Sequence, residues 1–405
     1  MGIESMKVRA TRVIDENRDR LIELSRSIFE EPELKFEEYN TVRKLLRELK
    51  NVDGLYIEKG IGNLETAFKA SLIGTKRKPT VAMLAEFDAL PNIGHGCGHH
   101  LICTSTVGAM LGLASVIGEL AGTVELIGTP GEEGGAGKII MHERGVFDHL
   151  DAVYSIHPYT ANMVGLKMLG IKRIRFRFIG KAAHASTDPH YGRSALEAVI
   201  QTFVNINGIR LYTKEDARIH GIIEDGGTVP NIIPETSSCL FYVRACDNNY
   251  LEELKLRVEN CAKAAAISTE TNLEIMPGEG RPYKPLKPNQ TLTHLMRKIL
   301  EDLGITDFED IPYLPGSNDM GDLSHDVPAA RAWLKICGKE VGLHTPDFAS
   351  ASMSEKGQEA IILAAKLQAL VAIELLYNPG LLEEIKGEFH RSINQSLLSP
   401  SAESS

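Results

Sequence analysis

The segment FDALPNIGHGCGHHL, residues 87–101, places five side chains that can bind a metal ion in one glycine-rich stretch. It follows the apolar run Thr80–Ala85, which predicts a buried strand. Ligands bind at the carboxyl ends of strands in open α/β sheets, and glycine lets a loop fold tightly around an ion. Cys97 and His99 offer a thiolate and an imidazole, which suit zinc and, less well, manganese. Taken alone, the segment also fits a glycine-rich turn with an inert buried cysteine. The five side chains are those of Asp88, His95, Cys97, His99 and His100.

Length and composition narrow the class of protein. At 405 residues the chain exceeds what one hydrophobic core usually supports, so we expect two domains or one domain with a large insertion. An apolar fraction of 43% with 24% charged residues is typical of a soluble globular protein. The net charge of −10 and the lack of a long basic stretch argue against a nucleic-acid partner.

The sequence shows no targeting or membrane signal. The charged N-terminus lacks the apolar core of a signal peptide, and no stretch reaches the roughly 18 apolar residues that a membrane span needs. Six cysteines without a regular spacing predict free thiols in a reducing compartment. We therefore expect a cytoplasmic protein that does not bind membranes.

The first part of the chain alternates between two patterns. Apolar residues at helical spacing predict helices, and short apolar runs between them predict buried strands. Strands and helices in alternation indicate a parallel sheet flanked by helices. The expected helices are Ala10–Phe29, Glu38–Leu49 and Cys103–Leu120, and the expected strands are Thr66–Ile73, Thr80–Ala85, Thr123–Gly128 and Ala152–Ile156.

After His157 the pattern changes. Ile171–Ile179 alternates basic and apolar residues, which predicts a strand with one solvent-facing side. The segments that follow complete the order βαββαβ, that of a compact ferredoxin-like α+β module. They are a helix over Ser194–Leu211, strands over Ile219–Ile223 and Ser237–Arg244, a helix over Tyr250–Ile267 and a strand over Asn272–Met276.

A proline-rich connection follows, and after it helical and strand patterns alternate again. They predict a helix over Leu292–Leu303, a strand over Ala329–Ile336 and a helix over Gln358–Tyr377. The predicted fold is α/β, a mixed and largely parallel sheet flanked by helices with an inserted ferredoxin-like domain. We place the sheet domain at residues 1–168 and 285–395 and the insertion at 169–284. The serine-rich residues 396–405 are expected to be a disordered tail.

Three further clusters of ligand-type residues follow apolar runs. Glu132 and Glu133 stand after Thr123–Gly128, and adjacent carboxylates can divide metal binding and proton transfer between them. His157 ends one predicted strand, and His344 follows another. A solvated acidic turn and lone surface histidines explain each cluster singly. Together with the segment 87–101, however, they predict a metal site at one edge of the sheet.

These motifs carry a resemblance to a known family. FEEPELKFEEY, AEFDALP, HGCGHH, TPGEEGG, IHP, GKAAHAS, GGTVPNIIPE and GLHTPDF occur in this order over most of the chain. They resemble the aminoacylase/carboxypeptidase family of co-catalytic metallopeptidases. Within it they are most similar to the amidohydrolase branch of indole-acetyl-amino-acid hydrolases, hippurate hydrolases, p-aminobenzoyl-glutamate hydrolase and β-alanyl-lysine type dipeptidases.

The resemblance implies a dinuclear metal site in a zinc-peptidase-like catalytic domain, with a smaller lid domain that also dimerises. Two divalent ions are implied per subunit, zinc first, with manganese or cobalt as alternatives. Glu132 matches the general base. His184 and Asn231 match the histidine and asparagine of the lid. The residues that match metal ligands are Cys97, His99, Glu133, His157 and His344.

The chain departs from the family pattern at two positions. His100 stands where the branch usually has Asp or Asn, so the sequence does not decide which residue orients a ligand at this position. Glu86 stands where other branches have a metal-binding histidine, and a structural role is expected for it. Asp88 can orient a ligand or cap a turn.

The implied reaction is amide hydrolysis. Two ions about 3.5 to 4 Å apart can share a water molecule and lower its pKa towards roughly 7. Glu132 would move the proton, and the metals with His184 would stabilise the oxyanion. The expected substrate is a dipeptide or an N-acyl amino acid, with an N-aroyl amino acid such as p-aminobenzoyl-glutamate as the alternative. A metal-binding or amide-binding module without catalysis is a third hypothesis, and the presence of Glu132 argues against it.

Two features of the predicted insertion remain open from the sequence. Arg244 and Arg193 can each bind a substrate carboxylate in a bidentate manner or form a surface ion pair. The alternating strand Ile171–Ile179 suggests an unpaired edge through which two copies form a homodimer. In that dimer His184 would act at the partner's active site, as the resemblance implies.

Overall fold

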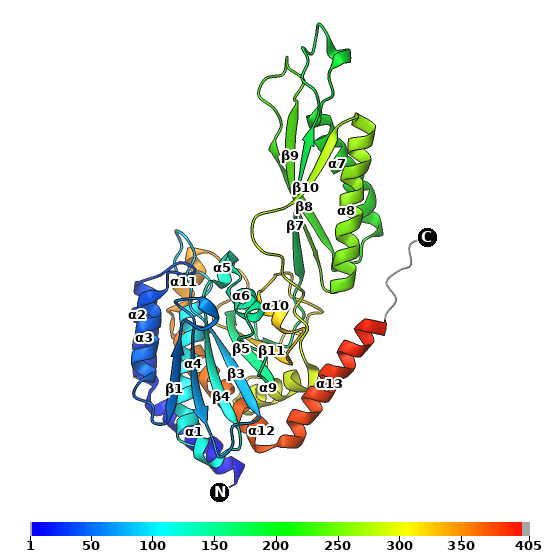
Figure 1. Ribbon diagram of the computed structural model, residues 1–405. Helices are drawn as coiled ribbons and strands as arrows, with labels where there is room; N and C mark the ends of the chain where they lie inside the picture. The colour runs from blue at the N-terminus through cyan, green and yellow to red at the C-terminus, as the bar shows by residue number, and fades with distance from the viewer. Residues whose placement is uncertain (1, 399–405) are drawn as a thin grey trace. The chain divides into compact units, whose positions relative to one another are not determined.

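The computed structural model describes residues 2–398, and the chain divides into two compact units (Figure 1). The first unit comprises Met1–Leu166, Lys287–Pro312 and Asp322–Ser405. The second comprises Lys167–Leu286 together with Tyr313–Gly321. The predicted boundaries placed this last segment in the sheet domain, because no change of pattern marks it.

A mixed sheet forms the centre of the first unit, as predicted. Across the described residues it has seven strands in the order β1–β2–β4–β3–β5–β11–β6. The four strands β4, β3, β5 and β11 run parallel to one another, and the outer pairs are antiparallel. The strands are β1 (Leu55–Lys59), β2 (Phe68–Ile73), β3 (Thr80–Glu86), β4 (Thr123–Thr129), β5 (Ala152–Tyr159), β6 (Met163–Val164) and β11 (Ala329–Lys335).

Strand register brings distant parts of the chain together at one edge of this sheet. Glu86 at the end of β3 pairs with Thr129 at the end of β4. On the other side, His157 in β5 pairs with Trp333 in β11. The loops that follow these parallel strands therefore leave the sheet at the same edge, as the sequence predicted.

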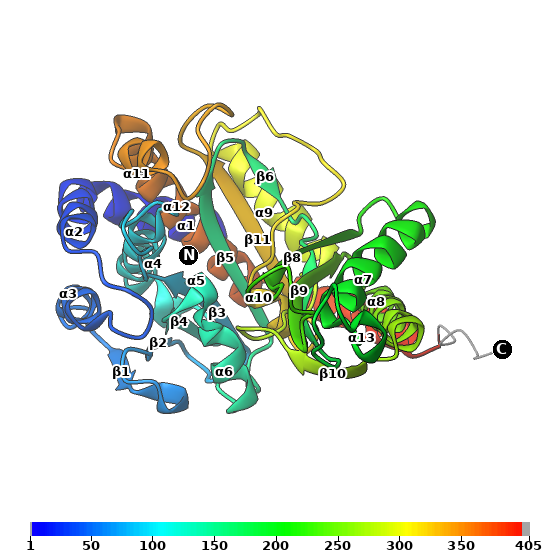
Figure 2. The same cartoon turned by 90° about the horizontal axis from the view of Figure 1, so that it is seen from above.

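The first unit contains both long and short helices, and Figure 2 shows α1, α4 and α12 close together on one side of β5. The predicted helix Cys103–Leu120 begins earlier, at His99, and ends at Ala114. The predicted helix Ala10–Phe29 is two helices that meet at Asn17. The helices are α1 (Ile3–Glu16), α2 (Arg18–Glu30), α3 (Tyr39–Leu49), α4 (His99–Ala114), α5 (Glu132–Gly135), α6 (Gly137–Glu143), α9 (Gln290–Asp302), α11 (Pro346–Ser352), α12 (Glu355–Tyr377) and α13 (Pro379–Leu398), with α10 (Met320–Leu323) at the boundary in sequence between the units.

Helices α4 and α12 pack closely against each other. A Cβ atom on Gly108 would lie 3.0 Å from the Cβ of Ala365, so the small side chains let the two backbones approach. Gln368 is fully buried, accepts a hydrogen bond from Thr106 at 3.2 Å and donates one to Ser105 at 3.1 Å. The contact therefore combines apolar packing with satisfied polar groups.

Two expectations about the C-terminal region are corrected. Helix α12 is long and apolar enough to cross a membrane, contrary to the expectation from the sequence, but 78% of its apolar window is buried inside the protein. The apolar composition of α12 is explained by its burial in the hydrophobic core. The predicted tail 396–405 begins inside α13, which extends to Leu398, while residues 399–405 lie outside the described part of the chain.

The second unit has the predicted order βαββαβ. Within the described residues it holds an antiparallel sheet of four strands in the order β10–β7–β9–β8, and α7 and α8 pack on it through a core that includes Phe176 and Phe241. This confirms the ferredoxin-like insertion. The elements are β7 (Gly170–Ile179), α7 (Ala195–Ile209), β8 (Arg218–Asp225), β9 (Thr236–Ala245), α8 (Asn248–Thr269) and β10 (Asn272–Pro277).

The predicted dimer edge is wrong in one respect. Strand β7, which contains Ile171–Ile179, pairs with β10 on one side and with β9 on the other. Its alternating pattern comes from a core-facing side and a basic solvent-facing side, and it is not an edge. The edges of the described sheet are β8 and β10.

The burial of α12 generates a stability prediction. Ile373 is fully buried, so Ile373→Ala should lower the free energy of unfolding by about 2–5 kcal/mol through lost contacts and a residual cavity. Unfolding in urea can be followed by the fluorescence of Trp333, the single tryptophan, which is buried in the same unit. The exposed Glu359→Ala on the same helix is the control and should change stability by less than about 0.5 kcal/mol.

Candidate active site

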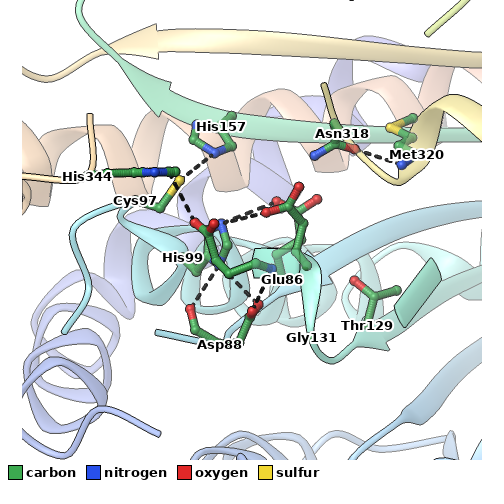
Figure 3. A network of polar contacts seen from close by, with 12 residues as sticks. Glu86, Asp88, Cys97, His99, Thr129, Gly131, His157, Asn318, Met320 and His344 are labelled. Atoms are coloured by element: carbon green, nitrogen blue, oxygen red, sulfur yellow. Dashed lines mark hydrogen bonds and ion pairs between the residues drawn. The ribbon is translucent and has the colours of Figure 1, made fainter. Parts of the chain in front are cut away.

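Loops that follow the parallel strands of the first unit bring the predicted ligand residues together (Figure 3). Cys97 and His99 follow β3, Glu133 follows β4, and His157 lies near the end of β5. His344 follows β11 and is held by a hydrogen bond from its backbone N–H to the carbonyl oxygen of Gly96 at 3.0 Å. Its φ of +62° turns the loop back towards the cysteine.

Cys97, His99 and His157 face one another in the buried part of the site. The Sγ atom of Cys97 lies 3.4 Å from Nε2 of His157. The rings of His99 and His157 meet edge to face, with centroids 5.8 Å apart. All three side chains are buried. Burial of polar atoms costs free energy unless they bind a hydrogen-bond partner or a metal ion.

Backbone contacts orient both imidazole rings in the same way. Nδ1 of His99 lies 2.9 Å from the carbonyl oxygen of Asp88, and Nδ1 of His157 lies 2.7 Å from that of Pro158. A carbonyl oxygen only accepts, so each Nδ1 carries the proton and donates. In each neutral ring the lone pair is then on Nε2, the atom that faces into the site. This is the arrangement of histidines that ligate a metal.

The acidic residues enter on an irregular loop. Gly131 and Gly134 have φ values of +66° and +74°, which L side chains rarely adopt, and Glu133 between them has ψ of 77°. The backbone N–H of Glu133 donates to Oδ2 of Asp88 at 2.8 Å. Asp88 thereby contacts both the His99 ring and the Glu133 backbone, as expected for a residue that orients ligands.

The donor set fits a metal centre. Within the described residues, three groups of ligand atoms have all members within 4.8 Å of one another. Nε2 of His99 and Oε1 of Glu133 are buried and have no hydrogen-bond partner in the described chain, although Nε2 of His344 lies 3.3 Å from that oxygen. The groups are Cys97–His99–His157, Cys97–Glu133–His344 and His99–Glu132–Glu133.

Electrostatics at these groups favour a cation. Burial lowers the pKa of His157 to about 3, so the ring is neutral and its lone pair is free at neutral pH. Burial also lowers the pKa of His99, but the facing Cys97 and Asp88 raise it more, and the net pKa lies well above its usual value. The surroundings of His99 therefore stabilise positive charge, and a bound metal ion would take the place of the second ring proton, on Nε2.

Glu132 extends beside this ligand set. Its Oε2 lies 3.9 Å from Nε2 of His99, and its side chain is 11% exposed. The carboxylate can therefore reach a molecule bound at His99 and still exchange protons with solvent, which a general base requires.

Sequence reasoning missed a buried ion-pair cluster centred on Glu86, whose Oε2 lies 3.7 Å from Nε2 of His99. Glu86 accepts hydrogen bonds from Nζ of Lys138 at 2.8 Å and from the guanidinium of Arg331, and all three side chains are buried. Burial raises the pKa of Glu86, but Arg331 and Lys138 lower it further, so the carboxyl stays ionised. The structural role expected for Glu86 agrees with these contacts. The sequence signal for this cluster was limited to two basic residues, Lys138 and Arg331, that stand next to apolar residues.

The ring of His100 forms no hydrogen bond with the proposed ligand residues in the described chain. It is fully buried, and its ring lies against His95 and Phe29, with centroids 4.9 Å and 5.2 Å away. Neither ring nitrogen has a hydrogen-bond partner in the described chain. The structure thus gives no support for a role of His100 in orienting a ligand.

The second unit brings His184 and Asn231 together. A backbone bridge pairs His184 with Ile232, and the N–H of Ala185 donates to the carbonyl oxygen of Asn231 at 2.9 Å. The N–H groups of Ser186 and Thr187 each donate to Nδ1 of His184 at 3.3 Å. In the neutral ring the proton is therefore on Nε2, which can donate a hydrogen bond.

The two arginines singled out from the sequence differ. Arg244 in β9 is partly buried and donates to Oγ of Ser317 at 2.8 Å. Arg193 forms an ion pair with Glu270 at 2.5 Å, with both side chains exposed. Arg193 thus follows the surface ion-pair alternative.

Comparison with known proteins agrees with this geometry. The model of peptidase family M20/M25/M40 matches residues 82–361. The chain is 34% identical to a mouse Xaa-Arg dipeptidase over 410 residues, which cover 98% of this chain and 95% of the relative. It is 28% identical to one of the subunits of the p-aminobenzoyl-glutamate hydrolase of Escherichia coli over 459 residues, covering 95% of this chain and 94% of that protein.

A solved structure shares the fold. A dinuclear metal-binding peptidase of the M20 family from Bacillus subtilis superimposes with a TM-score of 0.74 at 23% identity, covering 90% of this chain and 99% of that one. The match to the family model and the 34% identity to the mouse dipeptidase extend over most of the sequence, including the ligand loops. The chain therefore belongs to peptidase family M20/M25/M40, and within it to the amidohydrolase branch of metal-dependent hydrolases.

Proposed function

We propose that the protein hydrolyses the amide bond of dipeptides or N-acyl amino acids with two divalent metal ions held by the first unit. The observation that carries this proposal is a carboxylate, Glu132, placed 3.9 Å from Nε2 of His99 beside a complete set of metal ligands. The 34% identity to an Xaa-Arg dipeptidase makes dipeptides with a C-terminal arginine the first substrates to test.

Five side chains would hold the metal ions. When bound, the ions would polarise the amide carbonyl and lower the pKa of a water molecule towards about 7. The mixed sulfur, nitrogen and oxygen donors favour zinc, with manganese or cobalt as alternatives. The proposed ligands are Cys97, His99, Glu133, His157 and His344.

Glu132 would act as the general base and then as the general acid. Its carboxylate takes a proton from the attacking water and delivers it to the nitrogen of the leaving amine, so no covalent intermediate with the enzyme is needed. Asp88 would support this step by holding the His99 ring and the backbone of Glu133, the residue that follows Glu132.

The second unit would supply substrate contacts. Nε2 of His184 is the donor end of its ring and would stabilise the developing oxyanion, with Asn231 nearby to position the substrate. Arg244 offers a guanidinium for the substrate carboxylate. An N-aroyl amino acid such as p-aminobenzoyl-glutamate remains the alternative substrate class, supported by the 28% identity to that hydrolase.

We also propose a cytoplasmic homodimer formed by the second unit. Strand β8 lies at one edge of the sheet in the described chain, and Ile222 and Ile223 on it are 61% and 47% exposed. Two such edges can pair across a two-fold axis, and burial of their apolar side chains would add to the pairing.

The role of Cys97 can be tested by substitution. Cys97→Ser replaces a soft ligand with a poor one, so bound metal and activity should fall together by at least about tenfold. Metal content is measured by mass spectrometry after dialysis, and activity with zinc, manganese or cobalt on a panel of dipeptides and N-acyl amino acids. Cys103→Ser, at another buried cysteine, should keep full metal content. Full metal occupancy with normal turnover in Cys97→Ser would remove Cys97 from the site.

The role of Glu132 is separable from metal binding. Glu132→Gln keeps the shape of the side chain and removes its basicity, so kcat should fall by at least about a hundredfold while metal content is retained. The two quantities are compared with those of Glu133→Gln, which should lose metal as well. Loss of metal from Glu132→Gln alone would show that the two glutamates have exchanged roles.

The dimer proposal predicts complementation between inactive variants. His184→Ala and Glu132→Gln should each be nearly inactive, but a mixture that has exchanged subunits should regain activity. If His184 acts at the partner's site, one of the two sites in a heterodimer has both residues intact. Exchange of subunits is verified with differently tagged copies. Exchange without regained activity would refute action in trans, and a monomer in light scattering would refute the dimer.

A further inference from the structure

The turn between α2 and α3 contacts the loops that carry the site. From its contacts we infer that Glu38 is a positioning residue, which fixes the loop of Glu132 and Glu133 through a hydrogen bond to the backbone N–H of Gly131. Neither the family resemblance nor the ligand geometry assigns Glu38 a role. Its effect on catalysis rests on the proposed function, whereas its effect on the loop does not.

Both carboxylate oxygens of Glu38 have defined partners. Oε1 accepts a hydrogen bond from the N–H of Gly131 at 2.9 Å, and Oε2 accepts one from Oγ1 of Thr66 at 2.7 Å. The side chain is fully buried. Burial raises the pKa of Glu38 to about 7, so the chain retains a carboxyl group here at a cost in solvation.

The backbone of this loop is irregular. Gly131 and Gly134 have left-handed φ values and Glu133 has a non-helical ψ, so a regular helix does not fix the direction of the Glu132 side chain. The N–H groups on either side of Glu132, those of Gly131 and Glu133, each donate to a buried carboxylate. Glu38 accepts from the first at 2.9 Å, and Asp88 accepts from the second at 2.8 Å. The residue proposed as the base is therefore held between two fixed points.

Packing agrees with the hydrogen bonds. Phe36 has a φ of +65°, a strained value for a side chain of its size, and its ring lies below the loop. A Cβ atom on Gly131 or Gly135 would come within 2.8 Å of that ring. Two residues before the aromatic ring, Leu34 pairs with Ala89, whose N–H donates to the carbonyl oxygen of Glu33 at 2.8 Å. The turn thus contacts both the Asp88 loop and the Glu132 loop.

The experiment compares three variants in metal-free and metal-loaded protein. Glu38→Ala removes the acceptor, Glu38→Gln keeps an acceptor oxygen for Gly131, and the exposed Glu37→Ala is the matched control. Hydrogen exchange of the Gly131 amide reports on the loop without any substrate. Melting temperatures and metal content show whether each variant is folded and loaded.

The expected result separates a positioning role from a general loss of stability. In Glu38→Ala the Gly131 amide should exchange at least about tenfold faster, and amides in the core of β4 should be unchanged. In the same variant kcat should fall by about 10- to 100-fold with KM changed less than about threefold, because the base is displaced while substrate contacts remain. Glu38→Gln should restore most of the exchange protection and of kcat, and Glu37→Ala should match the wild type.

Several outcomes would overturn the inference. Unchanged exchange at Gly131 in Glu38→Ala would show that the hydrogen bond does not hold the loop, and faster exchange with normal kcat would show that the loop needs no such support. Equal impairment of Glu38→Gln and Glu38→Ala would also refute it. If Glu38→Ala does not fold, Thr66→Val is the second variant, because it removes the hydrogen bond that holds the Glu38 carboxylate. Its Gly131 exchange rate and its kcat should lie between those of the wild type and those expected for Glu38→Ala. Unchanged values in Thr66→Val would count against the inference. A wild type inactive on every substrate would refute the proposed function, and the exchange measurement would still decide the role of Glu38.

Discussion

One residue, Asp88, connects the parts of the site that the sheet brings together. Its backbone carbonyl and Oδ1 face Nδ1 of His99, and its Oδ2 accepts from the backbone of Glu133. The imidazole orientation and the position of the acidic loop therefore depend on the same short segment after β3. Burial raises the pKa of Asp88, but the hydrogen bond from His99 lowers it further, so the group is ionised at neutral pH. An ionised acceptor binds both partners more strongly than a neutral one would.

Much of the fold could be predicted from local patterns. The parallel strands are buried on both faces and appear as apolar runs, while β7 and its neighbours alternate, so both periodicities could be recognised. The order βαββαβ followed directly from them. Sequence patterns did not predict features that depend on tertiary packing. Asn17 separates two helices that share one apolar periodicity. The sequence analysis found no stretch apolar enough to span a membrane, whereas α12 is, and burial inside the protein accounts for its composition.

The predictability of the site has a similar limit. The proposed ligand residues occur in short glycine-containing motifs at strand ends, so Cys97, Glu133 and His344 could be named as candidates from the sequence alone. Their supporting residues have no such motif. Arg331 lies within an apolar strand, and it reaches Glu86 across 245 positions of sequence. Glu38 contacts Gly131 across 93 positions. Such pairs are set by strand order and by the packing of loops, which residue patterns do not specify. The same limit explains why the pattern of β7 wrongly predicts an edge.

The packing of α4 against α12 has a consequence for the order in which the chain folds during synthesis. Helix α4 is buried on nearly all sides, and much of its covering surface comes from α12, which is made about 240 residues later. Until that point the sheet of the first unit lacks a layer. The ferredoxin-like unit is nearly complete by residue 286, with only a nine-residue segment to follow. We therefore expect this unit to fold on the ribosome while the first unit is still open, with its apolar α4 exposed. An emerging chain in that state is a natural client for chaperones, although the finished protein hides the same surface.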